Sequence, residues 1–425
     1  MNELLRMLRE LPLSVKILLL IALARSVSFF ALLPFLPIYL HDTLDPDMVR
    51  VGYTLGLCLF VGTLTSVYGG YLADRFNKVS FMLALDVILT AIYLTLPVVH
   101  TLGPVLLLLM LANTASSSMS VTGNALLAEL LPTELRTKVF SLRYSLQNIG
   151  AVTGPFLGAW CARWDMRGPF WLAGTVTAFA LVLLGSTRRH FAVAPPGASK
   201  AEPDKPLRFS ETLRVMRADR RLGLFTLGGI LSMVIYGPLL TYLSQYLVVV
   251  AKNSDLAYKT VSYFSAANAF VVISLQYFVG SRLKPDNLLR WLTWGIAAFV
   301  VGLVGLSLWL SVAVALVPCI IAICIFTIGE VIVVPAEYTF IDSIAPSHLR
   351  GSYFGVQNLI YFGVALGPIM CGVLLDKATP VIMFYALIAV AITSWLFYVL
   401  GCRTVAAPSQ GPAAAAGTAG AAAPD

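Results

Sequence analysis

The sequence predicts an all-α membrane protein with twelve transmembrane helices in two pseudo-symmetric six-helix bundles. Three features predict this fold class: an apolar composition, apolar stretches long enough to cross a bilayer, and an internal repeat. The chain of 425 residues is 58% hydrophobic and 12% charged, with a mean hydropathy of +0.84. Soluble proteins carry about 25% charged residues. The surface of this chain is therefore too apolar for water, and we expect lipid around it.

Apolar stretches of about 20 residues, the length that crosses a bilayer, recur along the whole chain. We expect the first six spans at 13–40, 48–73, 79–100, 103–130, 138–161 and 169–187. We expect the last six at 222–250, 258–282, 288–311, 313–341, 351–374 and 380–401. The first stretch exceeds the apolar core of a cleavable signal peptide, which spans about 7–15 residues, so we interpret it as a membrane helix.

These spans divide the chain into four segments. We expect bundles at 1–187 and 222–402, a cytoplasmic linker at 188–221 and a disordered cytoplasmic tail at 403–425. The linker is rich in proline, and its end, from Phe209 to Arg221, has the pattern of a short basic amphipathic helix on the membrane surface. The tail is rich in Ala, Gly and Pro, a composition that cannot build a packed core.

The distribution of lysine and arginine predicts the orientation of the chain in the membrane. Most of these residues lie in the linker and in the loops on the same side as the two termini. The positive-inside rule therefore places both termini in the cytoplasm of a multi-pass protein of the cell inner membrane. The net charge of +8 then reflects topology and contact with anionic lipid, which argues against nucleic acid as a partner.

An internal repeat relates the two halves. The sequence PTELR at 132–136 recurs as PSHLR at 346–350, and four residues after each arginine stands Phe140 or Phe354. The glycines and proline of GxxxGP at 150–155 recur at 363–368. Two copies of one six-helix unit explain this pattern most simply.

The loop between the second and third spans carries a recognisable signature. It reads GGYLADRFNK from Gly69 to Lys78, and it resembles the signature G-x-L-a-D-r-x-G-r-k of the major facilitator superfamily. Asn77 replaces the second glycine and Val79 the next cation. The resemblance implies that this loop gates the cytoplasmic closure, and it assigns that role to Gly70, Asp74 and Arg75. The alternative is a simple topology anchor.

A second motif in the fifth span supports the same family. Gly150, Gly154, Pro155 and Gly158 are similar to the antiporter motif G-x-x-x-G-P-x-x-G of that superfamily, found mainly in proton-driven exporters. Glycines four apart let a neighbouring helix approach closely, and the proline favours a bend. Ordinary small-residue packing is the alternative. The resemblance covers the whole chain and points to the twelve-helix drug:proton antiporter branch.

A few ionisable residues fall deep inside predicted spans, where each costs at least about 2.5–3.5 kcal/mol and so needs a reason. Burial penalises the ionised form of a carboxyl, which lets it take up and release a proton. Glu330 is the first candidate for proton coupling and Asp86 the second. Arg25 and Arg143 are candidates for binding an anionic part of a substrate. For each of the four, a fixed interhelical ion pair is the alternative.

Polar and aromatic residues on the spans expected to line a central cavity predict a site for a polar or amphipathic ligand. Hydrogen bonding between helices is the alternative for any single member. The candidate substrate-binding residues are Arg25, Asn113, Arg143, Gln147, Asn148, Tyr236, Gln245, Gln357, Asn358 and Tyr361.

The sequence favours a transporter over an enzyme. It contains no phosphate-binding loop, and its six cysteines and four histidines show no metal-ligand spacing, so we expect no cofactor and no metal. We predict a monomeric, proton-coupled secondary transporter that exports a small drug-like or amphipathic molecule. The alternatives are a siderophore or metabolite exporter, a proton-coupled importer, and a non-transporting membrane receptor.

Overall fold

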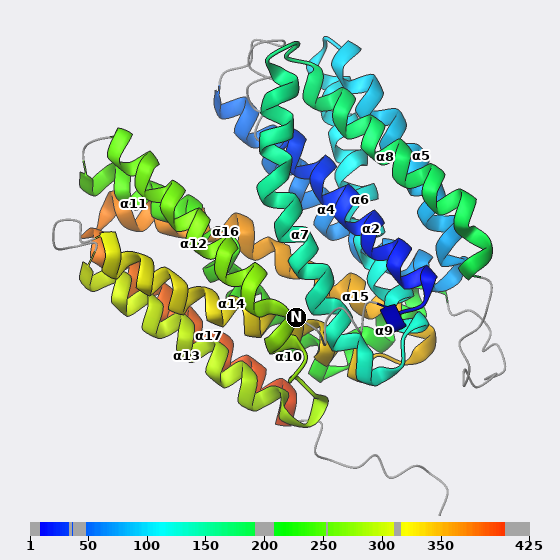
Figure 1. The fold of residues 1–425 in the computed structure, drawn as a ribbon. Helices are drawn as coiled ribbons and strands as arrows, with labels where there is room; N and C mark the ends of the chain where they lie inside the picture. The colour runs from blue at the N-terminus through cyan, green and yellow to red at the C-terminus, as the bar shows by residue number, and fades with distance from the viewer. Residues whose placement is uncertain are drawn as a thin grey trace, which may run out of the picture.

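The computed structural model describes residues 9–33, 36, 48–191, 208–251, 254–309 and 316–403. Within these residues the chain forms helices and no strands. Figure 1 shows two helical bundles that meet at one end and separate toward the other. The first bundle contains α2 (Leu13–Leu32), α4 (Met48–Arg75), α5 (Lys78–Thr95), α6 (Leu102–Leu130), α7 (Thr133–Ala162) and α8 (Gly168–Thr187).

The second bundle repeats this arrangement with more interruptions. It contains α10 (Arg220–Tyr236), α11 (Leu239–Ala251), α12 (Ser254–Gly280), α13 (Leu288–Trp309), α14 (Leu316–Ile344), α15 (Arg350–Gln357), α16 (Phe362–Lys377) and α17 (Pro380–Arg403). The short helix α9 (Phe209–Ala218) precedes α10 in the linker. The predicted tail after Arg403 lies outside the described residues.

Ten helices in the described part of the chain are long and apolar enough to cross a membrane. Two further predicted spans are helical but have a different character. The span at 138–161 lies in α7, which carries several charged residues near its start. The span at 222–250 lies in α10 and α11, which are separated at Gly237 and Pro238. The predicted all-α membrane fold is confirmed, and the count of twelve crossings stays a prediction.

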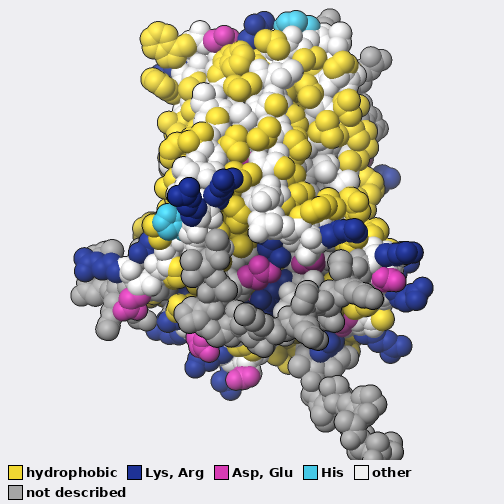
Figure 2. All heavy atoms as spheres, turned by 90° about the vertical axis from the view of Figure 1, so that its right-hand side faces the viewer, with side chains coloured by type: hydrophobic (Ala, Val, Ile, Leu, Met, Phe, Trp, Pro, Cys, Tyr) yellow, Lys and Arg dark blue, Asp and Glu magenta, His cyan; other side chains and the backbone are white. Residues whose placement is uncertain are grey.

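Apolar side chains face outward along the bundles, as expected of a surface in contact with lipid. Phe156 of α7 is 74% exposed and Phe270 of α12 is 72% exposed, and both lie within long helices. Figure 2 shows hydrophobic side chains over most of one face, with lysine, arginine, aspartate and glutamate gathered mainly toward its lower end.

The glycine motifs bring equivalent helices into close contact in both bundles. A Cβ atom on Gly150 of α7 would lie 2.4 Å from Oγ of Ser26 on α2, so only glycine allows this approach. In the second bundle, a Cβ atom on Gly363 of α16 would lie 2.4 Å from the carbonyl oxygen of Ile230 on α10. The repeat in the sequence therefore specifies the same helix packing twice.

Two interrupted helices of the second bundle lie against each other. The predicted span at 351–374 consists of α15, a 3-10 turn at Asn358–Tyr361 and α16. A Cβ atom on Gly367 of α16 would lie 2.6 Å from Cγ of Pro238, at the break between α10 and α11. Such breaks expose backbone groups, and they are tolerated at membrane depth where they line a cavity.

Candidate functional site

A cavity of about 1090 Å³ lies between the two bundles and is lined by residues from both. Most of the predicted substrate-binding residues line it: Arg25, Asn113, Arg143, Gln147, Asn148, Tyr236, Asn358 and Tyr361. Glu330 lines it as well. Gln357 and Asp86 are not among the lining residues, and the side chain of Gln245 lies outside the described part of the structure. The cavity therefore gathers residues that are more than 300 positions apart in the chain.

Glu330 joins the two bundles through its carboxyl group. It lies on α14 and is 6% exposed. Its Oε1 accepts a 2.5 Å hydrogen bond from the Tyr144 hydroxyl on α7 of the first bundle. Its Oε2 accepts a 2.8 Å hydrogen bond from Nδ2 of Asn268 on α12. Both donors are neutral, so this buried carboxyl is held by hydrogen bonds and not by a cation of the described residues.

Asp86 has a different environment, because Arg25 neutralises it. Nη2 of Arg25 on α2 lies 2.6 Å from Oδ2 of Asp86 on α5, and Nε lies 3.2 Å from Oδ1. The Asp86 side chain is fully buried. This two-point contact is the geometry of a fixed interhelical ion pair. It favours the structural interpretation of Asp86, while Arg25 still reaches the cavity.

Arg143 is a buried cation that donates a hydrogen bond to an amide. It lies on α7, is 8% exposed, and donates from Nη1 to Oδ1 of Asn124 on α6. Gly123 stands beside its other terminal nitrogen, where a Cβ atom would be 4.0 Å from Nη2. The guanidinium thus reaches the cavity wall with donors left for a ligand or for water.

The two bundles are closed against each other at one end, which we call the closed end and define by Asp74, Arg136 and the start of α15. Asp74 is the last acid of α4, and it receives hydrogen bonds of 2.7 Å from the backbone N–H groups of Gly351 and Ser352. The Ser352 hydroxyl donates a third, 2.6 Å long. These N–H groups belong to the first turn of α15, where the helix dipole attracts a negative charge.

Glycine makes this contact between α4 and α15 sterically feasible. A Cβ atom on Gly70 would lie 2.2 Å from the carbonyl oxygen of Gly351, and one on Gly355 would lie 2.8 Å from the carbonyl oxygen of Ser66. Arg75 does not reach across: its Nη1 donates a 2.8 Å hydrogen bond to the Tyr71 hydroxyl one turn earlier on α4. Of the three predicted gating residues, the structure therefore brings Gly70 and Asp74 to the interface between the bundles.

Asp342 holds a second contact at the closed end. It lies on α14, and its Oδ2 is 2.8 Å from Nη1 of Arg136 on α7 of the other bundle. Its Oδ1 is 3.4 Å from Nε of Arg350, an ion-pair distance without good hydrogen-bond geometry. One turn earlier on α14, the Thr339 and Thr137 hydroxyls lie 2.9 Å apart. The arginines of the two sequence repeats thus converge on one acid.

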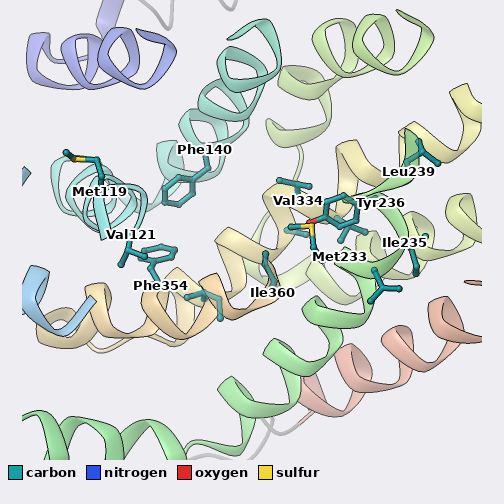
Figure 3. Packing of buried hydrophobic residues seen from close by; sticks show 14 of the residues in the cluster. Met119, Val121, Phe140, Met233, Ile235, Tyr236, Leu239, Val334, Phe354 and Ile360 are labelled. Carbon is teal, nitrogen blue, oxygen red and sulfur yellow. The ribbon is translucent and has the colours of Figure 1, made fainter. Parts of the chain in front are cut away.

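An aromatic cluster fills the space between these polar contacts and the cavity. Phe140 of α7 and Phe354 of α15 are both 2% exposed, and Figure 3 shows them on facing elements beside Val121. The Tyr338 ring lies 5.7 Å from the ring of Phe140. These rings separate the cavity from the closed end with apolar material that excludes water.

The linker helix α9 attaches to both bundles at the closed end. The Phe209 ring packs edge to face on Tyr68 and Tyr71 of α4, at centroid distances of 5.2 and 5.3 Å. After α9, Asp219 caps α10 and accepts a 2.9 Å hydrogen bond from the Tyr353 hydroxyl of α15. Burial opposes the ionisation of Asp219, but the hydrogen bonds from Tyr353 and Arg221 outweigh it and hold the pKa of Asp219 below its usual value.

Comparison with known proteins adds independent information to this geometry. The sequence profile of the Major Facilitator Superfamily matches residues 18–368. The uncharacterized MFS-type transporter YdeE of Escherichia coli is 33% identical over 392 residues, which cover 90% of this chain and 94% of that protein. The multidrug resistance protein MdtH of Escherichia coli is 26% identical over 82% of this chain and 83% of its own length.

The chain belongs to the major facilitator superfamily. Among solved structures, a bacterial homologue of the iron transporter ferroportin in an outward-facing state has a TM-score of 0.70, at 13% identity over 92% of this chain and 99% of that one. That likeness concerns the fold alone. Members of the major facilitator superfamily are transporters and not enzymes, so the central cavity is a place to bind a small solute within a lipid membrane.

Two residues of this major facilitator site were not singled out from the sequence. Tyr144 binds the Glu330 carboxyl, and Asp342 joins the bundles at the closed end. The sequence contained one indication of Asp342, which is an acid near the end of a predicted span. The sequence contained no indication of Tyr144, because no local pattern distinguishes it from the other tyrosines among the 17 in the chain.

Proposed function

We propose that this protein is a monomeric, proton-coupled secondary transporter that exports a small amphipathic organic molecule across the inner membrane by alternating access. Glu330 carries this proposal. It is a buried carboxyl in the central cavity, and the described residues offer it only neutral hydrogen-bond donors. A permanent charge there would cost at least about 2.5–3.5 kcal/mol, so the group gains by binding a proton.

Protonation of Glu330 would change the contact between the bundles. The ionised carboxyl accepts hydrogen bonds from Tyr144 of one bundle and Asn268 of the other. A proton removes the charge that strengthens these bonds, and the acid itself becomes a donor. Proton binding therefore weakens a link between the halves and biases their relative rotation, which is how proton movement can drive alternating access.

The orientation predicted from the basic residues places the closed end in the cytoplasm. In this conformation the cavity is then closed to the cytoplasm by Asp74, Asp342 and the Phe140–Phe354 pair. We assign the gating role to Gly70 and Asp74, and we assign Arg75 a supporting role through Tyr71. An exporter would release its substrate from this state and take up a proton at Glu330.

The lining of the cavity supports an amphipathic substrate. Phe29, Phe60 and Tyr93 offer apolar surface, and Asn113, Asn148 and Asn358 offer amides in the same cavity. A predominantly apolar pocket with a few converging polar groups fits a drug-sized organic molecule. The relative MdtH is named as a multidrug resistance protein, which supports drug-like compounds as the substrate class of this chain.

Ethidium accumulation in cells tests the proposal. Cells that produce the protein should accumulate less ethidium than control cells, and a protonophore should abolish the difference. Glu330→Gln should also abolish the difference in accumulation, at equal membrane abundance. The glutamine amide keeps the shape of the side chain but does not bind a proton at physiological pH. Glu129→Gln is the matched control: Glu129 lies 2.8 Å from Lys78 and outside the cavity lining, so this variant should behave as the wild type.

Three results would refute the proposal. The first is full protonophore-sensitive export by Glu330→Gln. The second is a wild-type protein whose effect on ethidium survives the protonophore. The third is higher accumulation in producing cells, which would indicate import.

A further inference from the structure

We propose that Glu337 is a second proton-binding site, nearer the closed end than Glu330, and that the two carboxyls bind the transported proton in succession. This inference rests on the proposed function, because it adds a step to the proton path. No role for Glu337 follows from the superfamily signature or from the antiporter motif.

The placement of Glu337 on α14 puts it in line with Glu330. The two residues are seven positions apart, which is about two helical turns and about 10.5 Å along the axis. Both line the central cavity. Because α14 runs toward Asp342 at the closed end, Glu337 lies between Glu330 and the closure. The Glu337 side chain is 1% exposed.

Glu337 is surrounded by neutral groups. The Tyr398 hydroxyl of α17 donates a short hydrogen bond to Oε1, and Nε2 of Gln357 on α15 lies 3.5 Å from Oε2. On α10, a Cβ atom on Gly229 would lie 3.4 Å from Oε1. The titratable groups that face it from the packed elements are tyrosines: Tyr236 of α10, Tyr338 of α14, Tyr361 of the 3-10 turn, and Tyr398.

The other buried acids of the described chain, Asp86 and Asp342, are paired with arginine. Asp86 has Arg25 at 2.6 Å, and Asp342 has Arg136 at 2.8 Å. Glu330 and Glu337 have no such ion pair in the described residues, and they are the two carboxyls that line the cavity. Acids that pair with arginine are fixed in charge, whereas acids that meet only neutral donors in apolar surroundings exchange protons.

Tyr236 is a cavity residue that relates to the surroundings of both carboxyls. It belongs to α10, lines the cavity, and interacts electrostatically with both Glu337 and Tyr144, the residue that binds Glu330. Figure 3 shows its ring beside Val334, which lies between Glu330 and Glu337 on α14. A hydroxyl can donate and accept at once. Tyr236 is therefore placed to pass a proton, with cavity water, from one carboxyl to the other.

The proposed sequence conserves the proton. Glu330 takes it from the water of the cavity while the closed end is shut. The proton stays on Glu330 until its weakened link to Tyr144 lets the bundles begin to rotate. It then moves from the Glu330 carboxyl to the Glu337 carboxylate, which leaves Glu330 ionised and free for the next exchange. When the bundles rotate and the closed end opens, Glu337 releases the proton to the cytoplasm. A single carboxyl would have to face both sides, and two carboxyls divide that task.

Carbodiimide labelling of the purified wild-type protein in liposomes tests whether Glu337 titrates. Dicyclohexylcarbodiimide reacts with protonated carboxyls in apolar surroundings, and mass spectrometry of peptides identifies the modified residue. We expect labelling at Glu337 that is strong at low pH and disappears as the pH rises, while Asp86, paired with Arg25, stays unlabelled throughout. Absent labelling at Glu337, or labelling independent of pH, would overturn the proposal.

The variant Glu337→Gln tests whether this titration belongs to the transport cycle. The amide oxygen still accepts the Tyr398 hydrogen bond, so the variant keeps the local structure. We expect proton-driven ethidium transport to fall by about a hundredfold, as when a positioned proton-transfer group is lost, while ethidium binding and ethidium–ethidium exchange persist. Wild-type rates and pH profile in this variant would remove Glu337 from the path.

Experiments can refute the proposed export function and the second proton-binding site at Glu337 independently of each other. If the wild type moves ethidium without a proton gradient, the proposed function fails whatever Glu337 does. If Glu330→Gln abolishes proton-driven export while Glu337→Gln exports normally, the proposed function stands and the second site is wrong. Tyr236→Phe should slow proton-driven transport and leave exchange intact, because it removes only the relay hydroxyl.

Discussion

The rings of Phe140 and Phe354 meet edge to face, with centroids 6.0 Å apart and planes at 71°. They occupy equivalent positions in the two sequence repeats, four residues after Arg136 and Arg350. The pseudo-twofold axis that relates the two bundles therefore passes through the closed end. The same axis brings both arginines to Asp342, which has no counterpart acid in the first repeat, where Ala128 stands instead.

Asp74→Asn should slow turnover more than it weakens substrate binding. The Asp74 carboxylate accepts three hydrogen bonds from the first turn of α15. The asparagine amide keeps one acceptor oxygen, but it lacks the negative charge that the helix dipole of α15 attracts. Transport rate in proteoliposomes and ethidium affinity measured separately give the comparison. Asp165→Asn is the control, since Asp165 lies in the turn between α7 and α8. An unchanged rate would mean that the loop only anchors the topology.

Gly70→Ala should prevent the bundles from closing, because its Cβ atom would lie 2.2 Å from the carbonyl oxygen of Gly351. We expect cross-linking between cysteines placed on α4 and α15 to fall sharply. Gly56→Ala, on the same helix α4, is the matched control, since a Cβ atom there has no heavy atom within 4 Å. Normal cross-linking in Gly70→Ala would contradict the close approach seen here.

Asp342→Asn should destabilise the closed end by about 3 kcal/mol, the lower range for breaking one side of a buried ion pair. The substitution leaves Arg136 and Arg350 together without an anion between them. Spin labels on α7 and α14 would report a shift from the short distance to a longer one. The double variant Arg136→Gln/Asp342→Asn should lose less stability than the sum of the two single variants. A loss equal to that sum would show that the two residues do not interact.

Arg25→Gln should lower the thermal stability of the purified protein strongly, because it leaves the fully buried Asp86 carboxylate without its cation, a loss of about 3–5 kcal/mol. The double variant Arg25→Gln/Asp86→Asn should recover most of the loss, since two neutral amides can bond to each other. Failure of the double variant to recover would indicate that Arg25 acts on more than Asp86.

Asp219→Asn should change stability in a pH-dependent way. The hydrogen bonds of Asp219 hold its pKa below the usual value, so its charge stabilises the fold at pH values above the unfolded pKa of about 3.9. That contribution is lost as the pH falls through the lower, folded-state pKa. The stability difference between wild type and Asp219→Asn should therefore be constant near neutral pH and shrink in acid. Asn is an equally good helix cap, so the comparison isolates the charge.

The sequence alone predicted much of this protein because its main determinants are local. Apolar length and composition specify helices in lipid, since a helix satisfies its backbone hydrogen bonds within one segment of chain. The repeated PTELR and GxxxGP patterns predicted two related halves, and the Gly70–Asp74 signature predicted a contact that the structure shows with Gly351 and Ser352. Each of these follows from a short stretch of chain.

The roles of the charged residues depended on the tertiary structure, because pairing is decided by neighbours far apart in the chain. Glu330 and Asp86 are both acids inside apolar spans and cannot be told apart by their local sequence. The fold places Arg25, 61 positions away, on Asp86, and places Tyr144, 186 positions away, on Glu330. One acid is thereby held in an ion pair and the other meets neutral hydrogen-bond donors. The free energy of a buried charge depends on the groups within a few ångströms of it, so the tertiary structure decides this difference.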